Sequence, residues 1–246
     1  MKWAALDPHG RLVHRTALPL DSSPTWVATL QEWGIPPESC WAIASVNSPV
    51  ATLLEATLRR ESAPSISWFR SAAEVPVRST LANPSAAGAD RALAVLAATA
   101  LGAKQRPGLV ISCGTAITVE RISASHVWEG GAIAPGLGVS ARALARGTAQ
   151  LPLVIPRSAP RGWGEDTESA LAAGVFWGMV GAVRELIRRQ DEHGAESRWR
   201  LWTGGDADLL HPSIEEHRSA NPIIPDLVLI GLALAAFGAV PEPLSS

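Results

Sequence analysis

The stretch between Gly88 and Pro152 constrains the fold and the chemistry of this chain more than any other part of it. GADR (88–91) places an acid beside a base where the apolar spacing predicts the start of a helix. SCGTAIT (112–118) then places a Gly-Thr turn between two apolar runs typical of strands. EGGAIAPGLGVSARAL (129–144) follows as a glycine-rich return loop that opens another helix, and TAQLP (148–152) ends the stretch. In this order, the pieces indicate one site for a phosphorylated ligand and for a hydroxyl group that is to be activated.

The composition indicates a folded protein with a substantial core. The chain has 246 residues, of which 47% are hydrophobic and 18% charged. This length suits one large domain or two domains of about 120 residues each. The net charge of −2 gives no electrostatic reason to expect nucleic acid or an anionic membrane as a partner.

The distribution of cysteines and apolar residues indicates a cytoplasmic protein. Cys40 and Cys113 lie inside apolar runs typical of strands, with neither a disulfide pattern nor a metal-binding spacing, which favours a reducing compartment. The histidines likewise lack the spacing of metal ligands. The first ten residues contain no apolar run typical of a signal peptide. No uninterrupted run of ~18 apolar residues occurs, so we expect no membrane-spanning segment.

Strands and helices alternate in the first part of the chain, which predicts an α/β sheet. Strands are expected over 3–6, 11–16, 41–46 and 66–69, with helices starting at Ser23 and covering 50–60. The segment 70–85 is irregular and contains Pro76 and Pro84. We therefore expect a domain boundary there, with one domain over 1–85 and a second over 86–246.

The second part of the chain has the same mixed character. Helices are expected over 90–103, 136–145, 168–189 and 227–237, strands over 109–113, 117–122, 127–128 and 199–203, and a helical turn over 214–217. The longest of these helices, 168–189, carries a continuous apolar stripe with its arginines outside it.

Asp90 is open to two interpretations. A carboxylate in the first turn of a helix is favoured by the helix dipole, so Asp90 with Arg91 as a salt partner is an ordinary helix start. Alternatively, Asp90 takes a proton from a substrate hydroxyl while Arg91 binds an anionic group. General base catalysis of this kind contributes about 10²–10⁴ in rate.

The other motifs have similar pairs of interpretations. Gly114-Thr115 can be a phosphate-binding turn, although the dipeptide alone favours a plain hairpin turn. Gly204-Gly205 follows a strand and can hold a nucleotide where a helix begins, or can be a tight turn only. Thr167 precedes the longest helix and is either a simple N-cap or a ligand-binding hydroxyl.

Taken in order, these residues resemble type III pantothenate kinases, a family in the acetate and sugar kinase, Hsp70 and actin superfamily. The resemblance is strongest over residues 80–240. The family motifs GxDR, DxGTAxT, YxGGxIxPG, TAxLP, NT and TGG correspond here to residues 88–91, 112–118, 128–136, 148–152, 166–167 and 203–205.

The resemblance implies an α/β fold of two ribonuclease-H-like domains, as in actin-like ATPases, around a cleft. It also implies a homodimer with pantothenate bound near the dimer interface. The reaction would convert ATP and pantothenate to ADP and 4′-phosphopantothenate, the first step of coenzyme A biosynthesis, with ATP bound as its Mg²⁺ complex.

The resemblance also implies roles for single residues. Asp90 would be the catalytic base. Pantothenate would be bound by Gly88, Ala89, Asp90 and Arg91, with help from Thr167. ATP would be bound by Gly114, Thr115, Gly204 and Gly205.

The sequence departs from the family pattern at two places. The family begins with a strand and a D-x-GNT phosphate loop, whereas MKWAAL (1–6) is similar to the strand after that loop. We therefore expect the first domain to lack its first strand and phosphate loop. Ser112 stands where the family has an acid that helps to bind a monovalent cation such as K⁺ or NH₄⁺, so the resemblance does not support a metal site there.

These departures leave three functions open. The chain is a pantothenate kinase, or it is a non-catalytic relative that binds pantothenate or regulates another protein, or it is a sugar kinase of the same superfamily. The last is disfavoured, because sugar kinases are usually much longer and do not place GADR just before a GTAIT hairpin.

Overall fold

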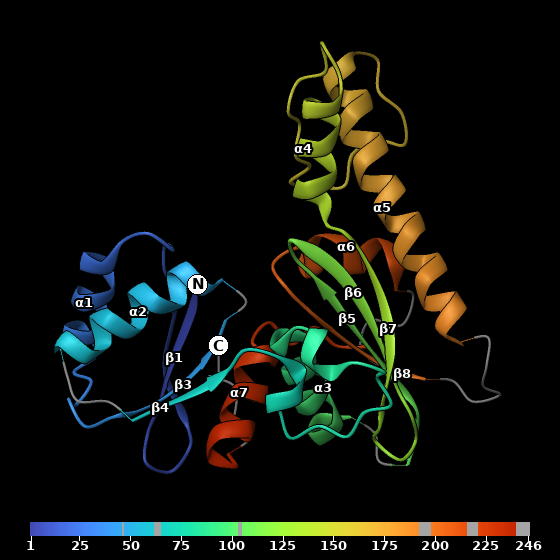
Figure 1. Ribbon diagram of the computed structural model, residues 1–246. Helices are drawn as coiled ribbons and strands as arrows, with labels where there is room; N and C mark the ends of the chain where they lie inside the picture. Colours follow the sequence, from blue (N-terminus) through green and yellow to red (C-terminus); the bar gives the residue numbers. More distant parts are fainter. Residues whose placement is uncertain (46, 62–64, 103–104, 192–197, 216–220, 240–246) are drawn as a thin grey trace. The chain divides into compact units, whose positions relative to one another are not determined.

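The computed structural model describes residues 1–45, 47–61, 65–102, 105–191, 198–215 and 221–239 (Figure 1). Two compact units are formed. Unit 1 contains Met1–Val77, Ala82–Ala100 and the segment from Leu227, whereas unit 2 contains Arg78–Leu81 and Leu101–Asp226. This partition differs from the domain boundary that we expected after residue 85, because the helix after GADR and the last helix both belong to unit 1.

Unit 1 contains two small sheets. Strand β1 (Lys2–Leu6) pairs antiparallel with β2 (Leu12–Ala17), and β3 (Cys40–Ala44) pairs parallel with β4 (Ser65–Phe69). The turn between β1 and β2 is held by the Asp7 carboxylate, which accepts hydrogen bonds from the backbone N–H groups of His9 and Arg11, both at 2.9 Å. Within the described residues, each of these sheets has two strands.

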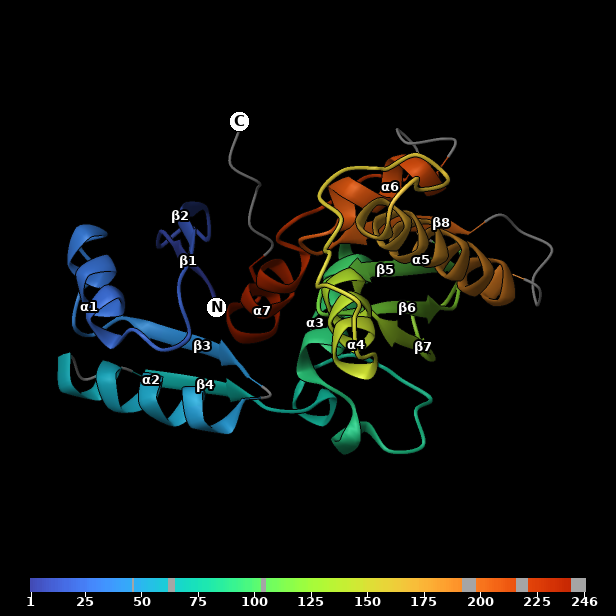
Figure 2. The same cartoon turned by 90° about the horizontal axis from the view of Figure 1, so that it is seen from above.

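Helices α1 (Ser23–Glu32) and α2 (Ser48–Glu61) enclose the core of unit 1, and α2 runs alongside β3 and β4 (Figure 2). Trp26 is fully buried, and its ring N–H donates to the carbonyl oxygen of Pro19 at 2.8 Å. The buried residues of this core are Trp3, Trp26, Ile43, Leu54 and Leu58.

The close packing of two helices explains why segments far apart in the sequence belong to unit 1. Helix α7 (Leu227–Phe237) contacts α3 (Ala89–Leu101) at Gly231, where a Cβ atom would lie 2.0 Å from the carbonyl oxygen of Leu93. Helix α7 also contacts β1 and β3. Only glycine permits this approach, so α3 and α7 pack together with the N-terminal strands.

The connection between the sheets of unit 1 and α3 is irregular, as the prolines predict. It contains the short 3₁₀ turns η1 (Ala72–Glu74) and η2 (Pro84–Ala86). The backbone N–H of Ala72 donates to the carbonyl oxygen of Ala87 at 2.9 Å, which joins the two turns just before GADR.

Unit 2 is built on a four-stranded sheet in the order β7-β6-β5-β8. Strands β5 (Gly108–Cys113), β6 (Ala116–Ile122) and β7 (Trp128–Pro135) are antiparallel, whereas β8 (Trp199–Thr203) is parallel to β5. The expected glycine-rich loop is therefore a strand. At Gly131 a Cβ atom would lie 2.2 Å from the carbonyl oxygen of Val119, so glycine allows β7 to approach β6.

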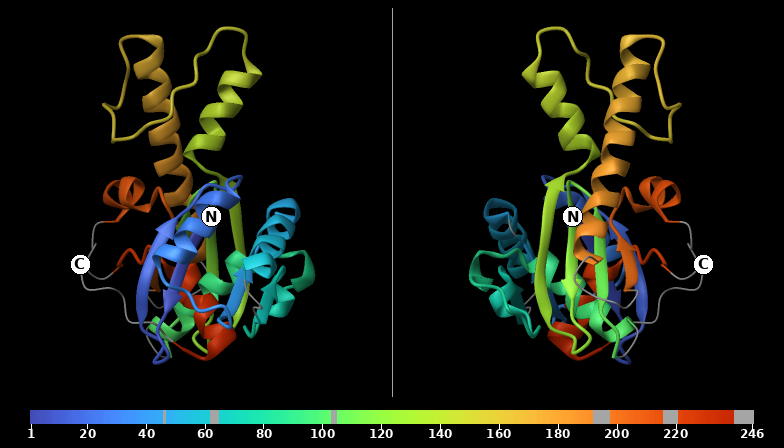
Figure 3. Two further views of the ribbon diagram at one scale, coloured as in Figure 1. Left: turned by 90° about the vertical axis from the view of Figure 1, so that its left-hand side faces the viewer. Right: turned by 90° about the vertical axis from the view of Figure 1, so that its right-hand side faces the viewer.

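Helices α5 (Thr167–Asp191) and α6 (Ala207–Ile214) pack on the same core of unit 2. Together with α5, α4 (Leu137–Gly147) forms an arm that extends beyond the sheet (Figures 1 and 3). A helical turn was predicted to begin at Ile214. This prediction is wrong, because α6 instead ends at Ile214, with Pro212 in its last turn. Residues 216 and 217 lie outside the described part of the chain.

Helix α5 is the one described helix that is long and apolar enough to cross a membrane by these two criteria. Its most apolar window has a mean hydropathy of 1.5. Phe176 and Val183 on this helix are fully buried in the core of unit 2. The same length and composition are found in core helices, so they do not by themselves indicate a membrane segment.

Candidate functional site

The Gly114-Thr115 turn lies at one end of the two central strands of the sheet in unit 2, where it connects β5 to β6. The backbone N–H of Gly114 donates to the carbonyl oxygen of Ala116 at 3.1 Å, which closes the turn. Thr115 is exposed, and its hydroxyl group makes no hydrogen bond with any other described residue. Because that hydroxyl is unused, it is available to a ligand.

Two other turns contact this hairpin through glycines. A Cβ atom on Gly136 would lie 1.9 Å from the carbonyl oxygen of Gly114, and one on Gly204 would lie 2.2 Å from that of Cys113. Gly204 also has a φ of +98°, which strongly favours glycine. We call the surface formed by these turns the glycine edge, which consists of Gly114, Thr115, Gly136, Gly204 and Gly205.

The glycine edge has little side-chain bulk at its surface. A Cβ atom on Gly205 would meet no described atom within 4 Å, and one on Gly114 would meet only the carbonyl oxygen of Ala116 at 3.9 Å. The sequence predicted that Gly114, Thr115, Gly204 and Gly205 act together, and the structure brings these four residues together within unit 2. Open backbone beside an exposed hydroxyl suits an oxyanion such as a phosphate group.

Ser112 belongs to a row of hydroxyl groups across the sheet. It pairs with Thr118 of β6 on one side and with Thr203 of β8 on the other. Side chains of directly paired residues lie on the same face of a sheet, and this is the face opposite to that of Cys113. Ser112, which stands where the family pattern has an acid, thus lies between two threonines that carry neutral hydroxyl groups.

Asp206 is a charged residue of this site that the sequence reasoning missed. It precedes α6, and its backbone N–H donates to the carbonyl oxygen of Cys113 at 2.9 Å. Burial raises the pKa of the Asp206 carboxyl, while the positive charge of Arg157 acts in the opposite direction. Burial raises the pKa of the Cys113 thiol to about 12, and the Asp206 charge adds to that increase. The sequence signal for Asp206 was its position directly after the TGG motif.

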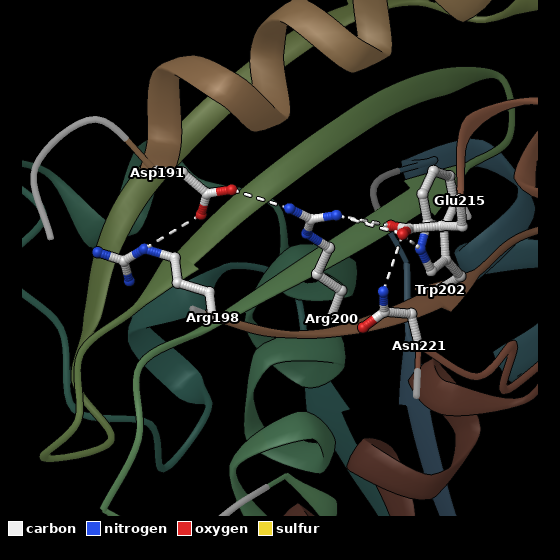
Figure 4. A network of polar contacts seen from close by, with 6 residues as sticks. All are labelled: Asp191, Arg198, Arg200, Trp202, Glu215 and Asn221. Carbon is white, nitrogen blue, oxygen red and sulfur yellow. Dashed lines mark hydrogen bonds and ion pairs between the residues drawn. The ribbon is translucent and has the colours of Figure 1, made fainter. Parts of the chain in front are cut away.

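A network of charged side chains holds the strand that leads into this edge (Figure 4). Arg200 of β8 donates to Asp191 at the end of α5 at 2.9 Å and to both carboxylate oxygens of Glu215 at 3.2 Å. Glu215 also accepts hydrogen bonds from Trp202 at 3.1 Å and from Asn221 at 2.8 Å. These contacts fix β8 against the ends of α5 and α6 and so position the Thr203–Gly205 turn.

GADR lies in unit 1, at the start of α3. Ala89 is fully buried, whereas Asp90 in the first turn is exposed. Among the described residues, the Asp90 carboxylate has neither a hydrogen bond nor an ion pair. The interpretation of Asp90 as a salt partner of Arg91 is therefore wrong. The exposed carboxylate remains available to a substrate.

Thr167 is the first residue of α5, but it is not the cap of that helix. The Asp166 carboxylate accepts a hydrogen bond from the backbone N–H of Ser169 at 2.8 Å, and the Ser169 hydroxyl accepts one from the N–H of Asp166 at 3.2 Å. The hydrogen bond from the backbone N–H of Ser169 lowers the pKa of the Asp166 carboxyl. Since Asp166 caps the helix, the exposed Thr167 side chain is not needed for that role. Helix α5 begins at the end of the arm away from the sheet, so the structure does not bring Thr167 to the glycine edge (Figure 1).

Unit 1 also contains a cavity of about 260 Å³ that sequence reasoning did not find. It lies between α2 and β4, and the Arg70 guanidinium stacks over the Trp68 ring at 4.7 Å in its wall. The remaining lining residues are Ser45, Ser48, Ala51, Thr52 and Glu55.

Similar solved structures identify the fold. A protein from Sinorhizobium meliloti described as a 2-dehydro-3-deoxygalactonokinase matches with a TM-score of 0.55 and 13% identity, over 96% of this chain and 95% of that chain. A protein from Campylobacter jejuni described as a Baf family transcriptional activator matches with a TM-score of 0.53 and 18% identity, over 83% of this chain and 85% of that chain. The fold is that of the actin-like ATPases and sugar kinases, as the sequence predicted.

Sequence comparison then identifies the family. Residues 6–189 match the family model of type III pantothenate kinase. The type III pantothenate kinase of Dehalococcoides mccartyi is 35% identical over 212 residues, which cover 83% of this chain and 78% of the relative. That of Porphyromonas gingivalis is 44% identical over 149 residues, covering 59% of each chain. That of Synechococcus elongatus is 38% identical over 156 residues, covering 63% of this chain and 62% of the relative, which is less than two thirds of that protein. The chain belongs to the type III pantothenate kinase family.

Proposed function

We propose that this chain transfers the terminal phosphoryl group of ATP to the hydroxyl group of pantothenate, which yields ADP and 4′-phosphopantothenate. This reaction is the first step of coenzyme A biosynthesis. The observation that carries the proposal is the exposed and unbonded Asp90 carboxylate, beside Arg91 in the GADR motif of a member of this family.

In this proposal Asp90 acts as a general base. Its carboxylate accepts the proton of the pantothenate hydroxyl as that oxygen forms a bond to the terminal phosphorus of ATP. The bond from this phosphorus to the bridging oxygen breaks, and ADP leaves with the electron pair. Gly88, Ala89 and Arg91 bind pantothenate, with Arg91 contributing a positive charge to its anionic group. Such positioning and charge stabilisation supply most of the catalysis in phosphoryl transfer.

The nucleotide is assigned to the glycine edge in unit 2. Thr115 offers an unused hydroxyl group, while Gly114 and Gly205 leave the backbone open to phosphate oxygens. Mg²⁺ bound with ATP supplies neutralisation of the phosphate charge. Ser112 offers a hydroxyl group in place of a carboxylate, so we assign no requirement for a monovalent cation to this chain.

We further propose a cytoplasmic homodimer that forms through the arm of unit 2. The arm and its surroundings carry exposed apolar side chains, which favour burial in an interface. These residues are Ile133, Leu144, Leu153, Trp163 and Trp177. Thr167 lies on the same arm, so its contribution to pantothenate binding would depend on this pairing.

The test is an assay of ADP formation by the purified chain with MgATP, in the presence and absence of pantothenate. We expect ADP formation that depends on pantothenate, with 4′-phosphopantothenate identified by mass spectrometry. Binding of pantothenate without product, by folded protein and also with K⁺ added, would contradict the proposal and would instead support the non-catalytic relative.

A further inference from the structure

Glu215 is a buried carboxylate that the proposed reaction does not use. It directly follows α6, and 3% of its side chain is exposed. Its two oxygen atoms accept hydrogen bonds from the side chains of Arg200, Trp202 and Asn221 (Figure 4). In a buried network of this kind, the loss of one acceptor leaves several donors without a partner. Glu215 therefore fixes the positions of all three side chains.

Trp202 is the contact that connects Glu215 to the glycine edge. Its indole N–H donates to the Glu215 carboxylate at 3.1 Å, and its fully buried ring packs edge-on against His211 of α6, with ring centroids 5.3 Å apart. Gly204 follows two residues later and packs so closely against Cys113 that a Cβ atom would lie 2.2 Å from its carbonyl oxygen. A displacement of Trp202 would therefore move the Gly204 turn.

The outer side of Trp202 is held by the segment that begins at Asn221. The backbone N–H of Trp202 donates to the carbonyl oxygen of Pro222 at 2.9 Å, and its carbonyl oxygen accepts from the N–H of Ile224 at 2.7 Å. The Asn221 side chain donates to Glu215 at 2.8 Å. Glu215 thus holds both the strand and the segment beside it, on the side of β8 opposite to β5.

A buried carboxylate bonded to an indole can also serve stability alone, and unit 2 contains such a pair. Glu120 of β6 is fully buried and accepts a hydrogen bond from the indole N–H of Trp128 at 2.9 Å. Trp128 pairs with Ile122, at the end of β6 away from the Gly114-Thr115 turn. Glu215 differs from Glu120 because its indole partner lies next to the glycine edge.

We propose that Glu215 is a positioning residue for the nucleotide, which holds the Gly204-Gly205 turn in place through Trp202. The inference rests on the proposed function, since it takes the glycine edge as the site of the ATP phosphates. Misplacement of a binding group by about 1 Å can cost about 10²-fold in rate, even when the substituted residue lies away from the chemistry. Loss of Glu215 should therefore weaken nucleotide binding, while pantothenate binding by the GADR motif in unit 1 stays unchanged.

The test compares the two ligands. Isothermal titration calorimetry would give the Kd for MgADP and the Kd for pantothenate, both on folded protein. Glu215→Gln keeps the size of the side chain but turns an amide N–H toward neighbouring donors. We expect its Kd for MgADP to rise about tenfold, within the range for a displaced binding group, and its Kd for pantothenate to stay the same. Glu215→Asp, which keeps the carboxylate, should restore part of the MgADP affinity. A purely structural role would lower the Tm without changing either Kd.

Trp202→Phe tests the contact from its other side, because it removes the indole N–H and keeps an aromatic ring. It should also raise the Kd for MgADP alone. The double variant with Glu215→Gln should add little to either single change, since both break the same hydrogen bond. If Glu215→Gln does not fold, Trp202→Phe decides the test. Glu120→Gln is the matched control, which should lower the Tm but leave both Kd values unchanged.

Three results would overturn the inference. They are an unchanged Kd for MgADP in Glu215→Gln or Trp202→Phe, an equal rise for both ligands, and a similar rise in Glu120→Gln. If the wild-type chain phosphorylates pantothenate and any of these results is found, only the inference fails. If the folded wild-type chain binds no MgADP, the inference and the proposed function both fail.

Discussion

Gly136 lies so close to Gly114 that a Cβ atom on Gly136 would come within 1.9 Å of the carbonyl oxygen of Gly114. In addition, the backbone N–H of Gly136 donates to the carbonyl oxygen of Thr115 at 2.9 Å. The start of α4 is thus held against the hairpin to which we assign the ATP phosphates. Side-chain volume at Gly136 would force these two turns apart.

Gly136→Ala should therefore destabilise the protein. Overpacking of this kind typically costs about 1–3 kcal/mol, and here the opposing atoms are backbone, which cannot rotate away. The free energy of unfolding from urea denaturation measures the effect. Gly174→Ala in α5 is the control: no described atom lies within 4 Å of the added Cβ, so this change should stabilise the helix by about 0.5–1 kcal/mol. Equal stability of the two variants would contradict the packing at Gly136.

The two cysteines should differ sharply in reactivity. Cys40 is exposed, whereas the Cys113 thiol is buried and has a pKa of about 12. Because the thiolate is the reactive species, Cys113 should remain unmodified by iodoacetamide at about pH 8, while Cys40 reacts. Mass spectrometry should find one modified cysteine in the native protein and two in denaturant. Modification of Cys113 in the folded chain would argue against the packing of β5.

The local elements were predictable where hydrophobic periodicity and turn residues agree. The strands that flank Gly114-Thr115 and the long helix after Asp166 fall where the pattern places them. Strand β7 (Trp128–Pro135) was expected only at 127–128, because glycine and proline have low strand propensity, while its glycines are needed for close approach to β6. Helix α6 was misplaced because Pro212 in its last turn masks the pattern.

The association of distant segments was harder to predict. Contact between Gly231 and Leu93 places the last helix in unit 1, and this depends on a backbone approach that no local pattern records. For the candidate site, the motifs predicted Asp90 and Thr115. Asp206 became visible only through its contact with Cys113 in three dimensions and through the hydrogen bonds that its carboxylate does not make.

The cap of α5 should give the stability of the protein a specific pH dependence. The hydrogen bond from the Ser169 N–H lowers the pKa of Asp166 in the folded state. The cap therefore contributes fully above the unfolded pKa of about 3.9, and this contribution is lost as the pH falls through the folded pKa. Asp166→Asn keeps an acceptor for the bond without titrating, so its Tm should fall less than that of the wild type from about pH 5 to pH 2. Parallel pH profiles of Tm would show that Asp166 is not the group responsible.

The dimer that we propose to form through the arm can be tested by introducing one charged side chain. Leu144 on α4 is an apolar side chain with 39% of its surface exposed. Leu144→Glu should shift the mass measured by light scattering at micromolar concentration from that of a dimer to 25.8 kDa. A stable dimer buries about 1,600 Å² of surface, and an unpaired charge inside it is strongly unfavourable. Leu53→Glu in unit 1 changes a side chain of similar exposure, 43%, and should leave the mass unchanged. A monomeric wild-type chain would contradict the proposed assembly.

Asp90→Asn should separate binding from catalysis. The side chain is exposed and makes no hydrogen bond or ion pair with other described residues, so its replacement should leave the Tm nearly unchanged. Pantothenate should still bind, because Gly88 and Arg91 remain. Loss of the base should lower kcat by about 10² or more, in the range for general base catalysis. Steady-state kinetics with pantothenate, together with calorimetry for its binding, measure both effects.

Asp21→Asn is a suitable control for charge, since Asp21 is an exposed acid of the same unit. It should have wild-type kcat and wild-type pantothenate binding. An Asp90→Asn enzyme with near-normal kcat would remove Asp90 from the role of base. A loss of pantothenate binding with little further change in kcat would instead make Asp90 a binding residue, because an interaction that acts only in the transition state lowers kcat.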